Sequence, residues 1–260
     1  MTIDTWIKIW RTGFAISFFG ATQFLICCVI SMVVYPGGTL IDSTSDGYSQ
    51  SENYLSDLGR EVSLSRQSHE TGSKIYNGSL IFLGICSLPF FAFMPTHAYD
   101  KVAGLSVAAA IGTLTAISLI VMGFSPCDVA PATHFLALLV WLITLFLSSS
   151  IHAICMLTSK EGISVALSLV SVAVAMLAVS YCYHGTETAA AVVFRREEIP
   201  LKSVLLQKLV FISMLIWMFS VSAKLLLTAD FSEFYERDVS KETTDYLKDL
   251  EDQPWVPTRK

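Results

Sequence analysis

Six long apolar stretches constrain the fold of this chain more than any other feature of its sequence. A helix rises about 1.5 Å per residue and the hydrocarbon core of a bilayer is about 30 Å thick, so about 20 apolar residues can cross it. The stretches lie at about 13–35, 75–95, 103–124, 133–157, 162–183 and 203–228. They predict an all-α fold, namely a polytopic integral membrane protein with six transmembrane helices.

The composition supports a membrane protein and excludes some partners. Hydrophobic residues make up 53% of the chain and charged residues 15%, whereas soluble domains carry about 25% charged residues. The net charge of −5 argues against a nucleic-acid partner, which would require a basic surface. The expected partner is therefore membrane lipid.

The six cysteines lie in or beside the apolar stretches and form no metal-type Cys-x-x-Cys motif. This arrangement predicts packing thiols rather than a disulfide framework. Cys127 and Cys182 are the pair that could reach the same membrane face and form one bridge.

Two regions differ in character. Residues 1–228 form the expected membrane domain, and residues 229–260 form an acidic, partly disordered cytoplasmic tail. Six spans place both chain ends on one side of the membrane. The connection at 125–132 contains no Lys or Arg, which favours an outer position under the positive-inside rule. We therefore expect both termini in the cytoplasm.

A long polar loop between the first two apolar stretches contains the most concentrated candidate chemistry. Its centre, residues 53–60, reads NYLSDLGR. In the expected topology, polar residues from three further positions share the outer face with this loop: Asp128, His134 and His184. His97 and His152 fall on the opposite face.

Histidine and carboxylate side chains can act as a general base and its partner, or hold a metal that activates water. Ser56 is the candidate nucleophile if a histidine reaches it. The catalytic candidates are Ser56, Asp57, His134 and His184. The candidate ligands of a divalent metal such as zinc are Asp57, Asp128, His134 and His184.

Each candidate also has a structural interpretation. Asp57 could cap a short helix or pair with Arg60, and Ser56 could be an N-cap. Asp128 lies in a proline-bounded turn and could be a turn former. The pattern therefore leaves open whether the protein is an enzyme, and a non-catalytic membrane scaffold or regulatory subunit is the alternative function. A transporter is disfavoured because no apolar stretch carries an isolated Asp, Glu or Arg in its interior.

Short motifs give the chain a resemblance to a known family. They are NxxSDLG at 53–59, IYNGSL at 75–80 and GFSP at 123–126, followed by His134. With these motifs the chain resembles domain-of-unknown-function family 998, whose members are bacterial and archaeal membrane proteins with six spans. The resemblance covers roughly residues 13–228. The polar residues matched in it are Asn53, Ser56, Asp57, Gly59, Asn77 and His134.

That family is distantly similar to the Frag/DRAM/Sfk-type membrane proteins, some of which are linked to lipid remodelling. The resemblance implies a bacterial or archaeal cell membrane, with the loop that carries Ser56 and Asp57 on its outer side. It implies no established activity. Our leading hypothesis is a membrane protein that acts on lipids or lipid-linked substrates at an outward-facing polar pocket.

Overall fold

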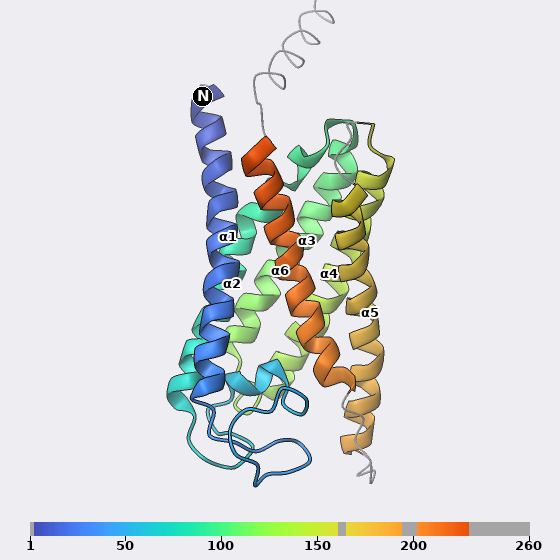
Figure 1. Ribbon diagram of the computed structural model, residues 1–260. Coiled ribbons are helices and arrows are strands. Elements are labelled where there is room, and N and C mark those ends of the chain that lie inside the picture. The colour runs from blue at the N-terminus through green and yellow to red at the C-terminus, as the bar shows by residue number, and fades with distance from the viewer. Residues whose placement is uncertain (1–2, 161–164, 194–201, 229–260) are drawn as a thin grey trace, which may run out of the picture.

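The computed structural model describes residues 3–160, 165–193 and 202–228 (Figure 1). Within these ranges no β-strand is found, and six helices are long and apolar enough to cross a membrane. The helices are α1 (Ile3–Val33), α2 (Glu70–Ala92), α3 (Val102–Phe124), α4 (Pro131–Thr158), α5 (Val165–Val193) and α6 (Lys202–Thr228). The predicted all-α, six-helix membrane fold is confirmed.

Two helices extend by about ten residues beyond the apolar stretches that predict them. Helix α1 begins at Ile3 rather than near residue 13, and α5 continues to Val193 rather than ending near residue 183. The added parts contain no proline, and the end of α5 contains three consecutive alanines, the strongest helix formers. His184 therefore lies within α5 instead of at its end. The predicted tail at 229–260 and the first residues of the fifth stretch, 162–164, lie outside the described residues.

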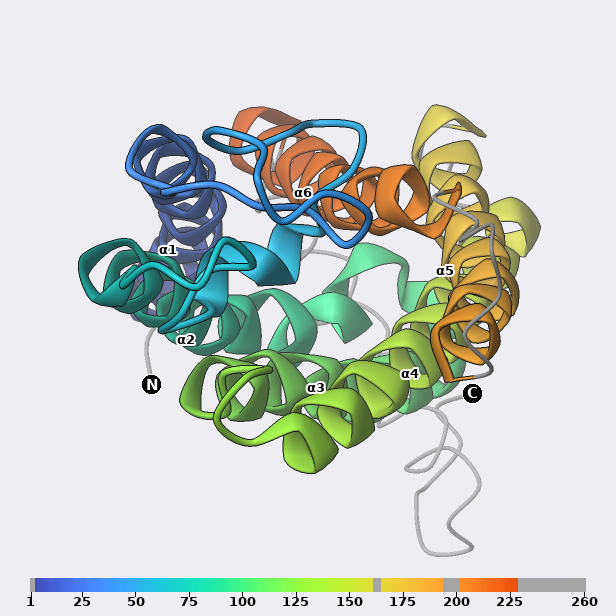
Figure 2. The ribbon, with the colours of Figure 1, turned by 90° about the horizontal axis from the view of Figure 1, so that it is seen from below.

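The six helices form a closed ring. Each helix packs against the next in the chain, and α6 also packs against α1 (Figure 2). Three short 3-10 helices lie in the connections: η1 (Leu55–Gly59), η2 (Met94–His97) and η3 (Tyr99–Lys101). We call the end of the ring that carries residues 34–69 and 125–130 the loop end. The opposite end carries η2, η3, the start of α1 and the end of α6 (Figure 1).

Aromatic side chains fill the middle of the ring. Trp141 of α4 stacks on Phe211 of α6 with ring centroids 4.5 Å apart, and Phe24 of α1 stacks on the same ring at 5.7 Å. All three side chains are buried. Large apolar side chains such as Phe19 and Leu136 are exposed instead, as a surface that faces lipid tails requires. At this level the ring encloses a packed core.

Small residues on α3 allow its neighbours to approach closely. A Cβ atom on Gly112 would collide with the ring of Phe91 in α2, and the Ser148 hydroxyl of α4 donates to the Ala108 carbonyl at 2.8 Å. The small residues of α3 therefore serve contacts with both α2 and α4.

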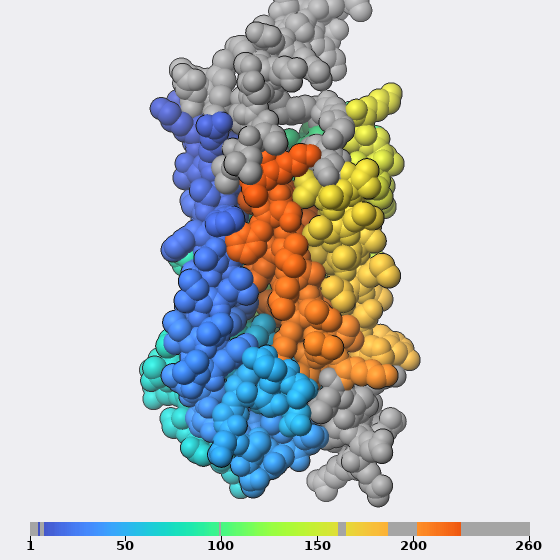
Figure 3. Space-filling model, viewed as in Figure 1, coloured from blue at the N-terminus to red at the C-terminus, as the bar shows by residue number. Residues whose placement is uncertain are grey.

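The segment 34–69 covers the loop end and is held there by α2 (Figure 3). Ser73 Oγ and Asn77 Nδ2 both donate to the Gly59 carbonyl, at 2.7 and 2.8 Å. A Cβ on Gly59 would lie 2.5 Å from Asn77 Oδ1, so only glycine permits this approach. These contacts fix η1 on the end of the bundle.

Candidate functional site

Asp57 organises the backbone of η1 from a buried position. Its Oδ2 accepts a hydrogen bond from the Tyr54 N–H at 2.8 Å and another from Asn53 Nδ2 at 3.3 Å. Burial raises the pKa of Asp57 above its ordinary value, although these hydrogen bonds and the positive charges of Arg60 and Lys208 act in the opposite direction. Asp57 thus caps the short helix, as one of its two structural interpretations predicts.

Lys208 of α6 fastens the loop segment to the bundle. Its Nζ donates to the carbonyl oxygens of Gln50 and Asn53, the latter at 2.8 Å. It also lies 5.0 Å from the centre of the Tyr48 ring, within range of a cation–π interaction. A lysine in an apolar helix therefore finds its partners in backbone carbonyls of the loop.

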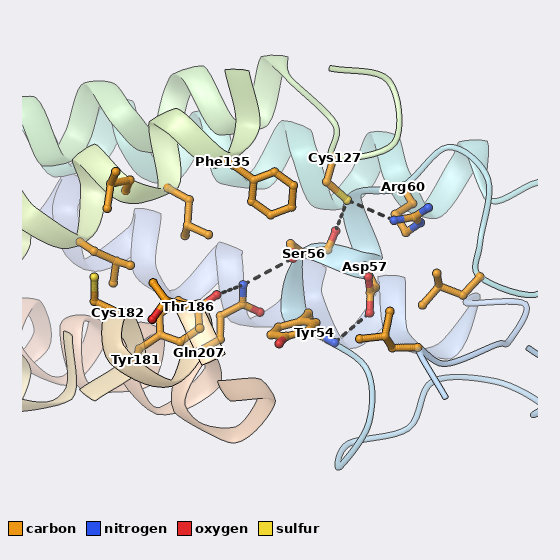
Figure 4. Close-up of a pocket in the computed structure, with 16 residues that line it drawn as sticks. Tyr54, Ser56, Asp57, Arg60, Cys127, Phe135, Tyr181, Cys182, Thr186 and Gln207 are labelled. Carbon is orange, nitrogen blue, oxygen red and sulfur yellow. Dashed lines mark hydrogen bonds between the residues drawn. The ribbon is translucent and has the colours of Figure 1, made fainter. Parts of the chain in front are cut away.

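Gln207, the neighbour of Lys208, connects three elements (Figure 4). Its Oε1 accepts a hydrogen bond from the Leu55 N–H at 2.6 Å. Its Nε2 donates to the Tyr181 hydroxyl of α5 at 3.1 Å and to Ser56 Oγ at 3.4 Å. The amide thus links η1, α5 and α6 at one buried point.

A cavity of about 520 Å³ adjoins this polar network. Ligand pockets in proteins commonly have volumes of about 300–1,000 Å³. Side chains from η1, the connection at 125–130 and helices α4, α5 and α6 surround it (Figure 4). Its polar lining includes Ser56, Asp57, Arg60, Cys127, Tyr181 and Gln207. Its apolar lining includes Leu40, Leu64, Phe135, Leu138, Leu139 and Leu142.

Arg60 and Cys127 lie together at the polar end. Arg60 Nη1 donates to Cys127 Sγ at 3.6 Å, and its Nε donates to the Val62 carbonyl at 3.2 Å. The Cys127 thiol points to the Ser56 carbonyl at 3.7 Å. Burial raises the pKa of Cys127 to about 11, so this cysteine is a protonated, weak nucleophile at neutral pH. Cys127 and Cys182 both line the cavity, and both are free thiols.

The other predicted site residues lie in separate environments. The buried ring of His134 forms a hydrogen bond with the Ser125 carbonyl at 2.8 Å. Asp128 Oδ2 accepts a hydrogen bond from the Val62 N–H at 2.9 Å. His184 is half-buried with its ring against Tyr183, and the cavity is lined by its neighbours Gly185 and Thr186.

Of the four catalytic candidates, Ser56 and Asp57 therefore line the cavity, and His134 and His184 are not among its lining residues. Within the described ranges, no three His, Cys, Asp or Glu side chains gather in a way that could hold a metal ion. The catalytic and metal-binding roles stay predictions.

The sequence alone does not single out Arg60, Tyr181 or Gln207 as site residues. A signal for Gln207 exists in the sequence, because Ser203 and Gln207 are four residues apart and share a face of the mostly apolar α6. The Tyr54 hydroxyl contacts Ser203, so this polar face meets η1.

The opposite end of the bundle holds a second polar cluster. It contains His97 and His152, which the sequence places on the membrane face opposite the polar loop. His97 Nδ1 lies 3.1 Å from His152 Nε2, and His152 Nδ1 lies 2.9 Å from Ser171 Oγ. The Trp217 ring packs against His152 with centroids 5.3 Å apart. All three members are buried.

One family model matches most of this chain. The family model described as "Protein of unknown function (DUF998)" matches residues 25–224, which include all of η1 and most of the six helices. The chain belongs to the DUF998 family. Comparisons with curated proteins and with solved structures find no match. This DUF998 member is thus a multi-pass membrane protein whose family carries no assigned activity.

Proposed function

We propose that this DUF998 protein binds a membrane lipid or a lipid-linked molecule in the loop-end cavity. The observation that carries the proposal is the amphipathic lining of the cavity. The lining combines polar side chains of η1 and Gln207 with a row of apolar side chains from α4. A lipid likewise combines a polar headgroup with an apolar chain.

The wall on α4 follows the spacing of one helical face. Phe135, Leu138, Leu139 and Leu142 are separated by three, one and three residues, and such positions share a side of a helix. The seven helical steps from Phe135 to Leu142 cover about 10 Å along the axis. This length offers room for part of an extended chain.

The cavity is accessible from the side of the bundle. Phe135 and Leu139 line it although 60% and 44% of their surfaces are exposed. Both belong to a helix whose outer face would contact lipid tails. A lipid could therefore enter laterally from the bilayer without leaving the apolar phase.

The geometry supports binding more than hydrolysis. A serine nucleophile requires a general base within hydrogen-bond distance of its hydroxyl. The side chain that contacts Ser56 Oγ is the Gln207 amide, which is not a base. His134 forms its ring hydrogen bond with Ser125 instead. We therefore assign Ser56 and Asp57 to the framework of a binding site.

A matched pair of substitutions tests the proposal. Leu139→Trp adds bulk inside the cavity, whereas Leu136→Trp adds the same bulk to an exposed position of the same helix outside it. Native mass spectrometry of purified protein should show retained lipid on the wild type and on Leu136→Trp, with a clear loss on Leu139→Trp. Equal retention on all three proteins would overturn the proposal.

We further propose that the loop end faces outward in a bacterial or archaeal cell membrane and that both termini are cytoplasmic. The support is the resemblance to the family together with the absence of Lys and Arg from 125–132. In intact cells, an impermeant maleimide should label Ser43→Cys above the wild-type background and leave Lys160→Cys at background. The reverse pattern would contradict this orientation.

A further inference from the structure

The guanidinium of Arg60 has unused hydrogen-bonding capacity at the polar end of the cavity. An arginine side chain carries five N–H donors. Arg60 uses one on the Val62 carbonyl and one on the Cys127 sulfur. Among the described residues its other N–H groups have no partner, and it forms no salt bridge.

The carboxylates of Asp57 and Asp128 each accept hydrogen bonds from N–H groups through Oδ2, and Asp128 Oδ1 is buried without a hydrogen-bond partner among the described residues. Asp57 Oδ2 accepts from the Tyr54 N–H and from Asn53 Nδ2, and Asp128 Oδ2 accepts from the Val62 N–H. The second nearby cation, Lys208, is likewise directed at the Gln50 and Asn53 carbonyls. Among the residues that the structure describes at this site, Arg60 is therefore the cation that remains available to a ligand.

The Asp57 and Asp128 carboxylates are the groups that would oppose an anionic ligand here. Burial raises the pKa of Asp57, and Lys208 and Arg60 offset the charge of its ionised form. The Ser56 hydroxyl also lines the cavity and can donate to an oxyanion. The surroundings of Arg60 thus accommodate negative charge.

We propose that the polar end of the cavity binds the anionic group of a lipid, a phosphate or a carboxylate, with Arg60 as its cationic partner. The inference rests on the proposed function, because the apolar wall on α4 supplies the binding of the chain. Guanidinium groups form paired, charge-assisted hydrogen bonds with both kinds of oxyanion. The ligand is therefore an anionic amphiphile rather than a neutral one.

The test compares two lipids with identical chains, phosphatidylglycerol and phosphatidylcholine, on the full protein in nanodiscs. Native mass spectrometry or competitive displacement should show a preference for phosphatidylglycerol of about tenfold, the size expected for one charge-assisted interaction. Arg60→Gln should abolish the preference while phosphatidylcholine is still retained. Arg60→Lys should keep part of it.

Arg66→Gln is the matched control, because Arg66 lies in the same segment but outside the cavity lining. It should keep the wild-type preference, and thermal unfolding should confirm that every variant is folded. Equal binding of the two lipids by the wild type, or an equal loss in both glutamine variants, would overturn the inference.

Two further outcomes separate the hypotheses. Inorganic phosphate at millimolar concentration should displace phosphatidylglycerol weakly, and displacement as strong as that by the lipid itself would show a site for free phosphate. If Leu139→Trp leaves lipid retention unchanged, the proposed function fails together with this inference. If Leu139→Trp removes lipid but charge selectivity is absent, only the anionic inference fails.

Discussion

The two ends of the bundle each bury a polar cluster, and the clusters differ in what surrounds them. At the loop end, Gln207 and Lys208 of α6 bind η1 and its flanking backbone. At the opposite end, His97 of η2 binds His152 of α4, which binds Ser171 of α5. Both clusters join a 3-10 helix to transmembrane helices.

The histidine cluster is enclosed by aromatic rings. Phe14 and Phe90 pack on His97 with centroids 6.0 and 6.1 Å away, and Trp217 packs on His152. The loop-end cluster instead adjoins a cavity that Arg60 lines with unused donors. The opposite end also holds buried groups without hydrogen-bond partners among the described residues, His97 Nε2 and Trp217 Nε1, so unmatched groups occur at both ends. A buried polar cluster suggests a ligand where it adjoins a cavity. Polarity within the bundle alone does not.

The largest expected effect is at Asp57, and it tests whether the loop end depends on this residue. Asp57→Ala removes the acceptor of the Tyr54 N–H and leaves Arg60 and Lys208 with less compensating charge. We expect a loss of about 3 kcal/mol in the free energy of unfolding. Thermal unfolding in detergent, followed by tryptophan fluorescence, measures it. An unchanged midpoint would show that the cap at η1 is dispensable.

The equivalent substitution at the opposite end sharpens the comparison. His152→Leu leaves His97 Nδ1 without its partner, and we expect a loss of about 2 kcal/mol. Lipid retention should stay at the wild-type level in the fraction that remains folded. A selective loss of lipid with an unchanged unfolding midpoint would contradict the assignment of this cluster to packing.

A smaller effect is expected at Gly59, where η1 meets α2. Gly59→Ala would place a Cβ 2.5 Å from Asn77 Oδ1, and the overpacking should cost about 1–2 kcal/mol. Gly78→Ala is the control, because a Cβ there meets nothing within 4 Å and alanine favours the helix. Equal unfolding midpoints for the two variants would exclude a tight contact at Gly59.

The smallest effect concerns pH. Burial raises the pKa of Asp57 above 3.8, so the folded state holds this proton to a higher pH than the unfolded state does. The folded state therefore binds more protons in that window, and stability falls as the pH rises through it. Wild type should lose stability relative to Asp57→Asn as the pH rises above about 4. Parallel curves, or the opposite slope, would contradict a raised pKa.

The sequence predicts the helices well because membrane crossing requires a length and an apolar composition that can be read directly. It also indicates the importance of residues 53–60, because a polar motif with Ser56 and Asp57 stands between two apolar spans. The sequence does not predict that α1 begins at Ile3 or that α5 continues to Val193. The residues added at these ends are compatible with a helix but are not strongly apolar.

The composition of the site is harder to predict. Gln207 meets Leu55 across 152 positions of sequence, and the rotation of α6 that allows this contact is set by packing in the ring. His134 and His184 were grouped with Asp57 because all three share one end of the bundle. Sharing an end does not specify which side of a helix faces the cavity, and His134 turns to Ser125. The roles of the histidines stay predictions.

Photocrosslinking in the native membrane tests the central claim most directly. A photoreactive benzoylphenylalanine replaces Leu139 in the cavity wall or, as the control, Leu136 on the exposed face of the same helix. After irradiation, mass spectrometry identifies the lipid attached to each position. We predict one enriched lipid class, anionic in its headgroup, at position 139, and bulk membrane composition at position 136. The same bulk composition at both positions would contradict a lipid-binding cavity at the loop end.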